Sequence, residues 1–166
     1  MALSSRCNAV AAHSRFGVNI ELPGPVGEQN LYGLHARGAA LCHAASEEAA
    51  IVQIACALSA GNRALLAGRA AQSVFDALPR ALRADIGLAD ASTSVDVVLT
   101  DCEGEALLDL LREVSQKSGP IASVFSLSAT RLQQGENWPL DWLMNEQTVT
   151  VNTTAAGGNA SLMSIG

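Results

Sequence analysis

Between residues 39 and 127, short apolar runs alternate with segments that repeat apolar side chains at a helical spacing, and this alternation restricts the possible folds most strongly. Strands that alternate with helices form parallel sheets with right-handed crossovers. The sequence therefore predicts an α/β fold with a doubly wound, mainly parallel sheet. The expected strands occupy residues 39–43, 63–67, 86–89, 95–99 and 121–127.

Two of the intervening helices carry clear signals. Ser46 is a good N-cap, and the acidic residues that follow it suit the positive end of a helix dipole. Gly61, together with Asn62, is expected to end this helix in a left-handed cap. A second helix is expected over residues 104–117, and its inward side is predicted to consist of Leu107, Leu108, Leu111 and Val114.

The composition argues against several classes of protein. Hydrophobic residues make up 49% of the 166 residues and aromatic residues only 4%, which suits close packing of helices on a sheet. The net charge of −6 argues against a nucleic-acid partner, because phosphate binding rests on Lys and Arg. No apolar run is long enough for a transmembrane helix, and residues 1–12 lack the features of a signal peptide.

The cysteines and histidines show no metal-ligand spacing, so no metal site is predicted. The cysteines lie at positions 7, 42, 56 and 102, and three of them fall inside apolar patterns, where a buried thiol behaves as a small hydrophobe. This usage favours a reducing, cytoplasmic setting.

The turn after the first expected strand is unsuited to a nucleotide. A doubly wound domain that binds a nucleotide has a Gly-rich turn at this point, where backbone amides reach phosphate. Residues 43–48 contain no glycine, and Glu47 and Glu48 stand where phosphate needs a positive potential. The turn at residues 100–104 is equally acidic. The sequence therefore predicts neither a cofactor-binding site nor a catalytic residue in this chain.

Cys102 is the candidate nucleophile that we weighed. It lies near the start of an expected helix, which favours a reactive thiolate, but Asp101 and Glu103 oppose this effect. A structural thiol is the favoured interpretation, and a catalytic thiol is the alternative.

The region after Leu127 changes character. Residues 131–137 are polar, two tryptophans follow, and residues 147–152 alternate as a half-buried strand does. We expect a β-hairpin flap over residues 131–152 that projects from the domain and presents an open edge. An open edge pairs readily with another strand, so the isolated domain is predicted to self-associate through it. The side chains assigned to the interface are Trp142, Leu143, Val149 and Val151.

The C-terminal tail consists of small residues. From Thr153 to Ser161 no side chain is larger than Asn or Thr, so the segment has little apolar surface to bury. We expect it either to lie on a larger partner surface or to be a disordered terminus. Its apolar anchors are Leu162, Met163 and Ile165.

Two sharper interpretations of this tail are disfavoured. Gly157-Gly158 is compatible with a phosphate-binding loop, but neither a helix nor a cation follows it. The segments that begin at Asn152 and Asn159 match the glycosylation acceptor pattern, but the chain shows no route to secretion.

Residues 149–166 resemble the extreme C-terminus of the long form of proline utilization A, a family of bacterial enzymes that depend on a flavin and NAD. Thr154 and Ser164 are conservative departures from the family pattern. The segment Pro23–Tyr32 resembles the start of the family's C-terminal domain, and Gly119-Pro120-Ile121 lies at the expected place between the two.

The resemblance covers nearly all of the chain after a lead-in or linker at residues 1–22, in which a short helix is expected near Asn8–Ser14. It implies a Rossmann-like domain at residues 23–130, similar to that of the aldehyde dehydrogenase superfamily but without catalytic residues. The flap at residues 131–152 and the tail motif at residues 153–166 follow this domain.

Members of this family oxidise proline through pyrroline-5-carboxylate to glutamate. The resemblance implies that FAD and NAD bind outside this chain, in domains that would precede Met1, and that the flap covers the dehydrogenase domain of the same parent chain. It also implies that the tail helps to seal the tunnel through which the intermediate passes. The residues given this role are Asn152, Thr153, Thr154, Ala155, Ala156, Gly157, Gly158, Asn159, Ala160, Ser161, Leu162, Met163 and Ile165.

Two other functions stay open on the sequence alone. One is an independent, small α/β protein that binds a nucleotide, and the other is a free-standing interaction module. The missing Gly-rich turn weighs against the first.

Overall fold

A computed structural model of the chain describes residues 2–153, and Met1 and residues 154–166 lie outside the described part. A five-stranded parallel sheet, with the strand order β5-β4-β3-β6-β7, forms the centre of the domain. The predicted doubly wound parallel sheet is therefore confirmed. Its strands are β3 (Ala39–His43), β4 (Arg63–Ala67), β5 (Ile86–Leu88), β6 (Val97–Thr100) and β7 (Ser123–Ser126).

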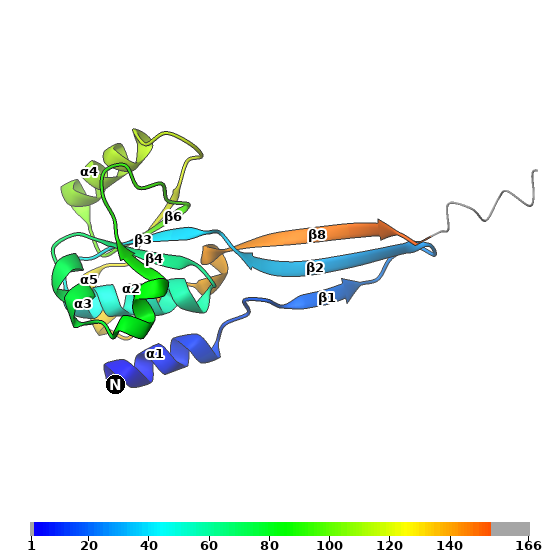
Figure 1. Cartoon of the computed structure of the whole chain (residues 1–166), viewed down its shortest axis with the longest axis horizontal. Coiled ribbons are helices and arrows are strands. Elements are labelled where there is room, and N and C mark those ends of the chain that lie inside the picture. Colours follow the sequence, from blue (N-terminus) through cyan, green and yellow to red (C-terminus); the bar gives the residue numbers. More distant parts are fainter. Residues whose placement is uncertain (1, 154–166) are drawn as a thin grey trace, which may run out of the picture.

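Helices cover both faces of this sheet (Figure 1). On one side lie α1 (Leu3–Ala12), α2 (Glu47–Ser59) and α3 (Ala71–Ala77), and on the opposite side lies α4 (Gly104–Ser115). The remaining helical elements are short: η1 (Arg80–Ala84), α5 (Ala129–Gln133) and η2 (Leu140–Leu143).

The ends of α2 are those that the sequence indicates. The Ser46 hydroxyl accepts a hydrogen bond from the amide of Ala49 at 3.2 Å, which satisfies one of the amides left free in the first turn. At the other end Gly61 takes a positive φ of 76°, a conformation that costs glycine little because it has no Cβ. The predicted N-cap and left-handed end are both confirmed.

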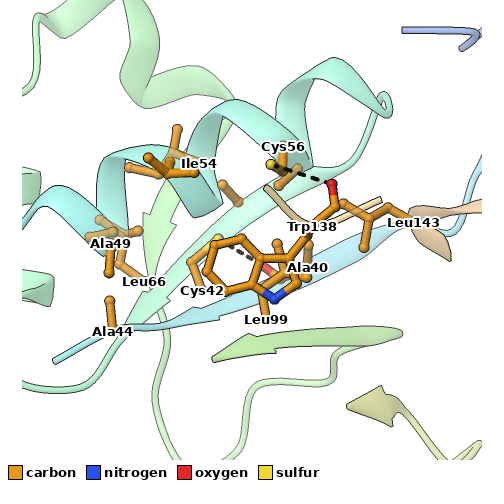
Figure 2. Packing of buried hydrophobic residues seen from close by; sticks show 14 of the residues in the cluster. Ala40, Cys42, Ala44, Ala49, Ile54, Cys56, Leu66, Leu99, Trp138 and Leu143 are labelled. Carbon is orange, nitrogen blue, oxygen red and sulfur yellow. Dashed lines mark hydrogen bonds between the residues drawn. The ribbon is translucent and has the colours of Figure 1, made fainter. Parts of the chain in front are cut away.

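The larger of two cores lies between the sheet and α2 (Figure 2). Its side chains are mostly small, so that helix and sheet can approach closely and exclude water. The labelled members are Ala40, Cys42, Ala44, Ala49, Ile54, Cys56, Leu66, Leu99, Trp138 and Leu143. A second core lies between the sheet and α4, and its buried members include Leu41, Leu65, Val98, Leu110 and Val114.

A three-stranded antiparallel ribbon projects from the domain (Figure 1). Its strands are β1 (Asn19–Leu22), β2 (Glu28–Ala36) and β8 (Met144–Asn152), with β2 in the centre. In the register of β2 and β8, Glu28 pairs with Asn152 at the tip and Ala36 with Met144 at the base. A projecting β-structure is therefore present as predicted, but it has three strands, whereas a hairpin has two.

The partner of β8 differs from the prediction. A hairpin within residues 131–152 was expected, but β8 pairs with β2, which precedes it by more than a hundred residues. Residues 129–143 instead form α5, a loop and η2, because Leu132, Trp138 and Leu143 are buried in the larger core. Pairing between strands distant in sequence leaves no local pattern, and this explains the error.

Residues 1–22 are not the linker that we expected. Helix α1 is longer than the predicted helix at Asn8–Ser14 and packs against α2, and β1 forms the edge of the ribbon. The buried guanidinium of Arg6 anchors α1, since it donates to the Leu132 carbonyl oxygen at 2.9 Å and to the Asn137 side chain at 2.8 Å. The segment Pro23–Pro25 connects β1 to β2 and therefore lies inside the ribbon rather than at a domain boundary.

Two expectations about burial also need correction. Leu143 was assigned to an exposed interface, but its side chain is completely buried in the larger core. On α4, Leu110 and Val114 face the sheet, whereas Leu108 and Leu111 are 45% and 39% exposed. A helix turns by about 100° per residue, so an inward face centred on Leu110 turns Leu108 and Leu111 outward.

The side chain of Asn62 joins the domain to the ribbon. Its carbonyl oxygen accepts from the amide of Gly38 at 2.9 Å, at the point where β2 passes into β3. Its amide group donates to the carbonyl oxygen of Leu143 at 2.9 Å, directly before β8. Asn62 is 2% exposed, so both bonds are shielded from water. One buried amide thus fixes the points at which both long strands leave the domain.

We predict that Asn62→Asp destabilises the domain by about 1–3 kcal/mol, because a carboxylate keeps the acceptor for Gly38 but has no hydrogen to donate to Leu143. Urea unfolding followed by circular dichroism measures this change. Asn145→Asp, at an exposed position of β8, is the matched control and should change stability by less than about 0.5 kcal/mol. Equal effects of the two substitutions would contradict the assigned role of Asn62.

Candidate functional site

The carboxyl ends of β3 and β6 form the topological switch point of the sheet. From β3 the chain continues to β4 on one side, and from β6 it continues to β7 on the other side. Parallel α/β sheets bind their ligands in the crevice at such a point, between the loops that follow the two strands. The loops to consider are residues 44–46 after β3 and residues 101–103 after β6.

In the loop after β3, the backbone amide of Ala45 is already hydrogen-bonded to a side chain of the same chain. Both carboxylate oxygens of Asp101 accept from the amide of Ala45, at 3.0 and 3.3 Å. Asp101 is 8% exposed, so its negative charge lies where the phosphate of a nucleotide would otherwise meet this amide. Glu47 and Glu48 in the first turn of α2 add to the negative potential. The geometry thus supports the expectation of no nucleotide here, and that expectation stays a prediction.

The loop after β4 also closes on this point. Gly68 takes a φ of 83°, and a Cβ at this position would lie 2.6 Å from the carbonyl oxygen of Ala44. The amide of Ala44 in turn donates a hydrogen bond to the carbonyl oxygen of Ala67 at 3.2 Å. Gly68 is therefore required after β4, because it lets the two backbones come into contact. A phosphate-binding turn would instead have its glycine after β3, where this chain has none.

Cys102 lies beside His43 at this edge. The Cys102 Sγ is 3.5 Å from Nδ1 of His43, and the same Nδ1 is 3.4 Å from the Thr100 hydroxyl. The loop is held in place because the Thr100 hydroxyl accepts from the Cys102 amide at 3.1 Å and the Ser126 hydroxyl donates to the Cys102 carbonyl at 2.6 Å. No sequence pattern indicates this pairing, because the two residues are 59 positions apart.

Two of the other thiols, Cys42 and Cys56, are buried in the larger core. Burial raises the pKa of Cys42 far above its usual range and that of Cys56 to about 12. These two groups therefore behave as small hydrophobes, as expected. Cys7 is only partly buried, and this burial raises its pKa. Within residues 2–153, no group of three His, Cys, Asp or Glu side chains is arranged to hold a metal ion.

The projecting ribbon has apolar side chains on both faces. Residues that pair directly across antiparallel strands share a face. Leu31 pairs with Val149, and Val151 lies two positions further along β8 on the same side. The opposite side carries Ile20, paired with Tyr32, and Leu22. We call the first set the valine face and the second the isoleucine face.

Both faces are accessible, and so is one edge. Val149 and Val151 are 44% and 43% exposed, and Ile20 is 49% exposed. Strand β8 is last in the ribbon's strand order, so no further strand lies along its outer edge within the part of the chain that the structure describes. A thin sheet with this exposure is a surface suited to docking.

The predicted interface residues separate into three groups. Val149 and Val151 lie on the ribbon and are exposed, whereas Leu143 is buried. Trp142 is half exposed but sits on η2, where its ring packs on Phe125 with centroids 5.0 Å apart, so it belongs to the base of the ribbon.

The structure reaches only the start of the predicted tail motif. Asn152 ends β8, and the amide of Thr153 donates to the Gly27 carbonyl oxygen at 2.8 Å. The rest of the motif, from Thr154 to Ile165, lies outside the described residues. Sequence reasoning missed the contributions of β1 and β2, which supply the whole isoleucine face and, on the valine face, Leu31. Apolar side chains at positions 20 and 22 were a weak signal of β1.

The fold belongs to a known class. The chain has a TM-score of 0.56 to gamma-glutamyl phosphate reductase from Thermotoga maritima, at 15% identity over 75% of this chain and 35% of that one. A proline utilization A (PutA) variant from Bradyrhizobium japonicum gives a TM-score of 0.58, at 20% identity over 76% of this chain and 15% of that one. The chain is thus a Rossmann-like α/β domain that shares its fold with these two proteins and carries a projecting ribbon.

Sequence relatives identify the family. The chain is 35% identical to the bifunctional protein PutA of Rhizobium meliloti over 158 residues, and 36% identical to that of Salmonella typhimurium over 171. These alignments cover 92% and 99% of this chain but only 13% of each relative. The chain therefore belongs to the PutA family and corresponds to one domain, consistent with the C-terminal one. No family model matches the chain.

None of the helices within residues 2–153 is both long enough and apolar enough to span a membrane.

We predict that saturating NAD leaves the melting temperature of this chain unchanged, because the Ala45 amide is already bonded to Asp101. A domain of this size that bound NAD would gain about 5–10 °C at a concentration about 100-fold above its Kd. Differential scanning fluorimetry measures the change, with an NAD-dependent aldehyde dehydrogenase as the positive control. A rise of several degrees would overturn the prediction.

Proposed function

We propose that this chain is a non-catalytic domain of a bifunctional enzyme that oxidises proline to glutamate by way of pyrroline-5-carboxylate. The observation that carries this proposal is the relation to PutA proteins over 92–99% of the chain. FAD and NAD are proposed to bind in other parts of the parent protein. The bond between Ala45 and Asp101 supports this assignment, and it disfavours an independent nucleotide-binding protein. Four free cysteines within the described residues support a reducing, cytoplasmic setting.

The ribbon is the part proposed to cover the aldehyde dehydrogenase domain of the parent chain. Its valine face and isoleucine face both expose apolar side chains, and each Val or Ile that becomes fully buried contributes about 1.5–3 kcal/mol. The free edge of β8 adds main-chain hydrogen-bonding groups that a partner strand can satisfy. A rigid ribbon anchored through Asn62 holds these groups in one orientation.

The tail at residues 153–166 is proposed to help seal the tunnel for the intermediate. Its small side chains allow the backbone to lie close to a partner surface, while Leu162, Met163 and Ile165 anchor it. The described structure supports this role at its first residue, since the bond from Thr153 to Gly27 starts the tail at the tip of the ribbon.

We predict that Gly157→Leu in the complete enzyme uncouples the two reactions. A bulky side chain between closely packed surfaces costs about 1–3 kcal/mol, enough to lift a tail held by three anchors without unfolding a domain. Proline oxidation should continue at the unmodified rate, whereas NADH production from proline should fall and develop a lag. Both rates are measured on the same sample.

Ser161→Ala is the matched control for this experiment, because it keeps the tail small and should leave both rates unchanged. NADH that appears from proline without a lag in the Gly157→Leu enzyme would show that the tail does not seal the tunnel.

We also predict that the isolated chain forms a concentration-dependent dimer through the ribbon, because the partner domain is absent and a second copy offers the same edge. Replacing both Val149 and Val151 with Lys should raise the dimer Kd about tenfold or more, since charges then replace the valine face. Sedimentation velocity over a range of concentrations measures the Kd.

Leu108→Lys is the control for this change, because Leu108 is 45% exposed but lies on α4, away from the ribbon. A monomer at all concentrations, or an equal loss of association in the α4 variant, would contradict self-association through the ribbon.

A further inference from the structure

The geometry points to Cys102 and His43 as a thiol-modification site at the switch point of the sheet, which exchanges with small neutral or cationic disulfides. The pair joins elements that the fold brings together, since His43 ends β3 and Cys102 follows β6. Their side chains approach to 3.5 Å between Sγ and Nδ1, close enough for proton transfer between thiol and imidazole. The site is independent of the proposed role in proline oxidation.

Both partners are held in position by hydrogen bonds from neighbouring side chains. The fully buried Gln53 donates its amide to the carbonyl oxygen of His43 at 3.3 Å, which fixes the end of β3. The loop that carries Cys102 is fixed through its backbone by Thr100 and Ser126, at 3.1 and 2.6 Å. The reacting atoms are therefore preorganised, while Cys102 as a residue is only half-buried.

A cavity beside the imidazole can receive the reagent. His43 lines a cavity of about 210 Å³, to which Leu41, Leu110 and Val114 contribute apolar surface. This volume accommodates the short organic half of a small disulfide. Its polar lining includes Asp90, Glu113 and Lys117.

The exchange is balanced within these groups and the reagent. Nδ1 of His43 accepts the proton of the Cys102 thiol, and the thiolate attacks one sulfur of the disulfide. A new S–S bond to Cys102 forms as the reagent's own S–S bond breaks, and the leaving thiolate takes up the proton from the imidazole. The products are a mixed disulfide on Cys102 and one free small thiol.

Charge around the pair selects the reagent. Asp101 and Glu103 lie in the loop after β6, Glu47 is the first residue of α2, and Asp90 and Glu113 line the cavity. The positive charge of Lys117, whose ammonium donates to the carbonyl oxygens of Ala91 and Thr93, is outweighed by these carboxylates. The resulting negative potential concentrates cations and repels anions, more strongly at low ionic strength.

The test is the rate of adduct formation on the intact chain, followed by mass spectrometry with peptide mapping. The probes are three alkyl disulfides of similar size, namely cystamine as a dication, hydroxyethyl disulfide as a neutral reagent and dithiodipropionate as a dianion. Cys102 should form the first adduct, and cystamine should react about tenfold faster than dithiodipropionate at low salt, a ratio that shrinks at high salt. Cys102→Ser should abolish the fast adduct, and Cys7→Ser should leave it unchanged.

The role of the imidazole is tested with His43→Gln. This variant should react about tenfold more slowly with hydroxyethyl disulfide at pH 7, and should match the unmodified chain at about pH 10, where thiols ionise without help. A purely structural effect would persist at both pH values. Preferential labelling of Cys7, an unchanged rate for His43→Gln at pH 7, or equal rates for the three reagents at low salt would overturn the proposal.

Discussion

The buried amide of Asn62 is the interaction on which the shape of this protein depends. It bonds at the same time to Gly38, where β2 becomes β3, and to Leu143, where η2 becomes β8. A second hydrogen bond holds the junction of β2 and β3, since the Asp96 carboxylate accepts from the amide of Ala39 at 2.8 Å. The ribbon is therefore a rigid extension of the parallel sheet, because both of its long strands are fixed where they leave the core.

The switch point of this sheet differs from that of a cofactor-binding α/β domain. The switch point between β3 and β6 is intact, but the Asp101 carboxylate bonds to the amide that a phosphate would need, and Gly68 stands after β4 rather than β3. A fold fixes where a ligand can bind and leaves the chemistry to individual residues. In this chain the residues at the switch point are a thiol, an imidazole and several carboxylates, while the ribbon exposes the apolar side chains of Ile20, Val149 and Val151.

Prediction from the sequence succeeded where local physics decides the structure. The runs at residues 39–43 and 63–67 form strands with those same bounds, because continuous apolar character suits a strand buried on both faces. Ser46 and Gly61 delimit α2 as expected, because capping depends on a few neighbouring residues. The strand at residues 147–152 also followed from its alternation, and it forms part of β8 (Met144–Asn152).

The sequence by itself thus determined the parallel sheet, helices α2 and α4, the lack of a phosphate-binding turn and the family to which the chain is similar. Only the tertiary structure decided which strand pairs with β8, why Leu143 is buried and Leu108 is not, and that Cys102 lies beside His43. The physical reason is the same in each case. Helix caps, turns and periodicity are local properties of the sequence. The contacts above join residues far apart in the chain, and they are selected by the packing of the whole domain.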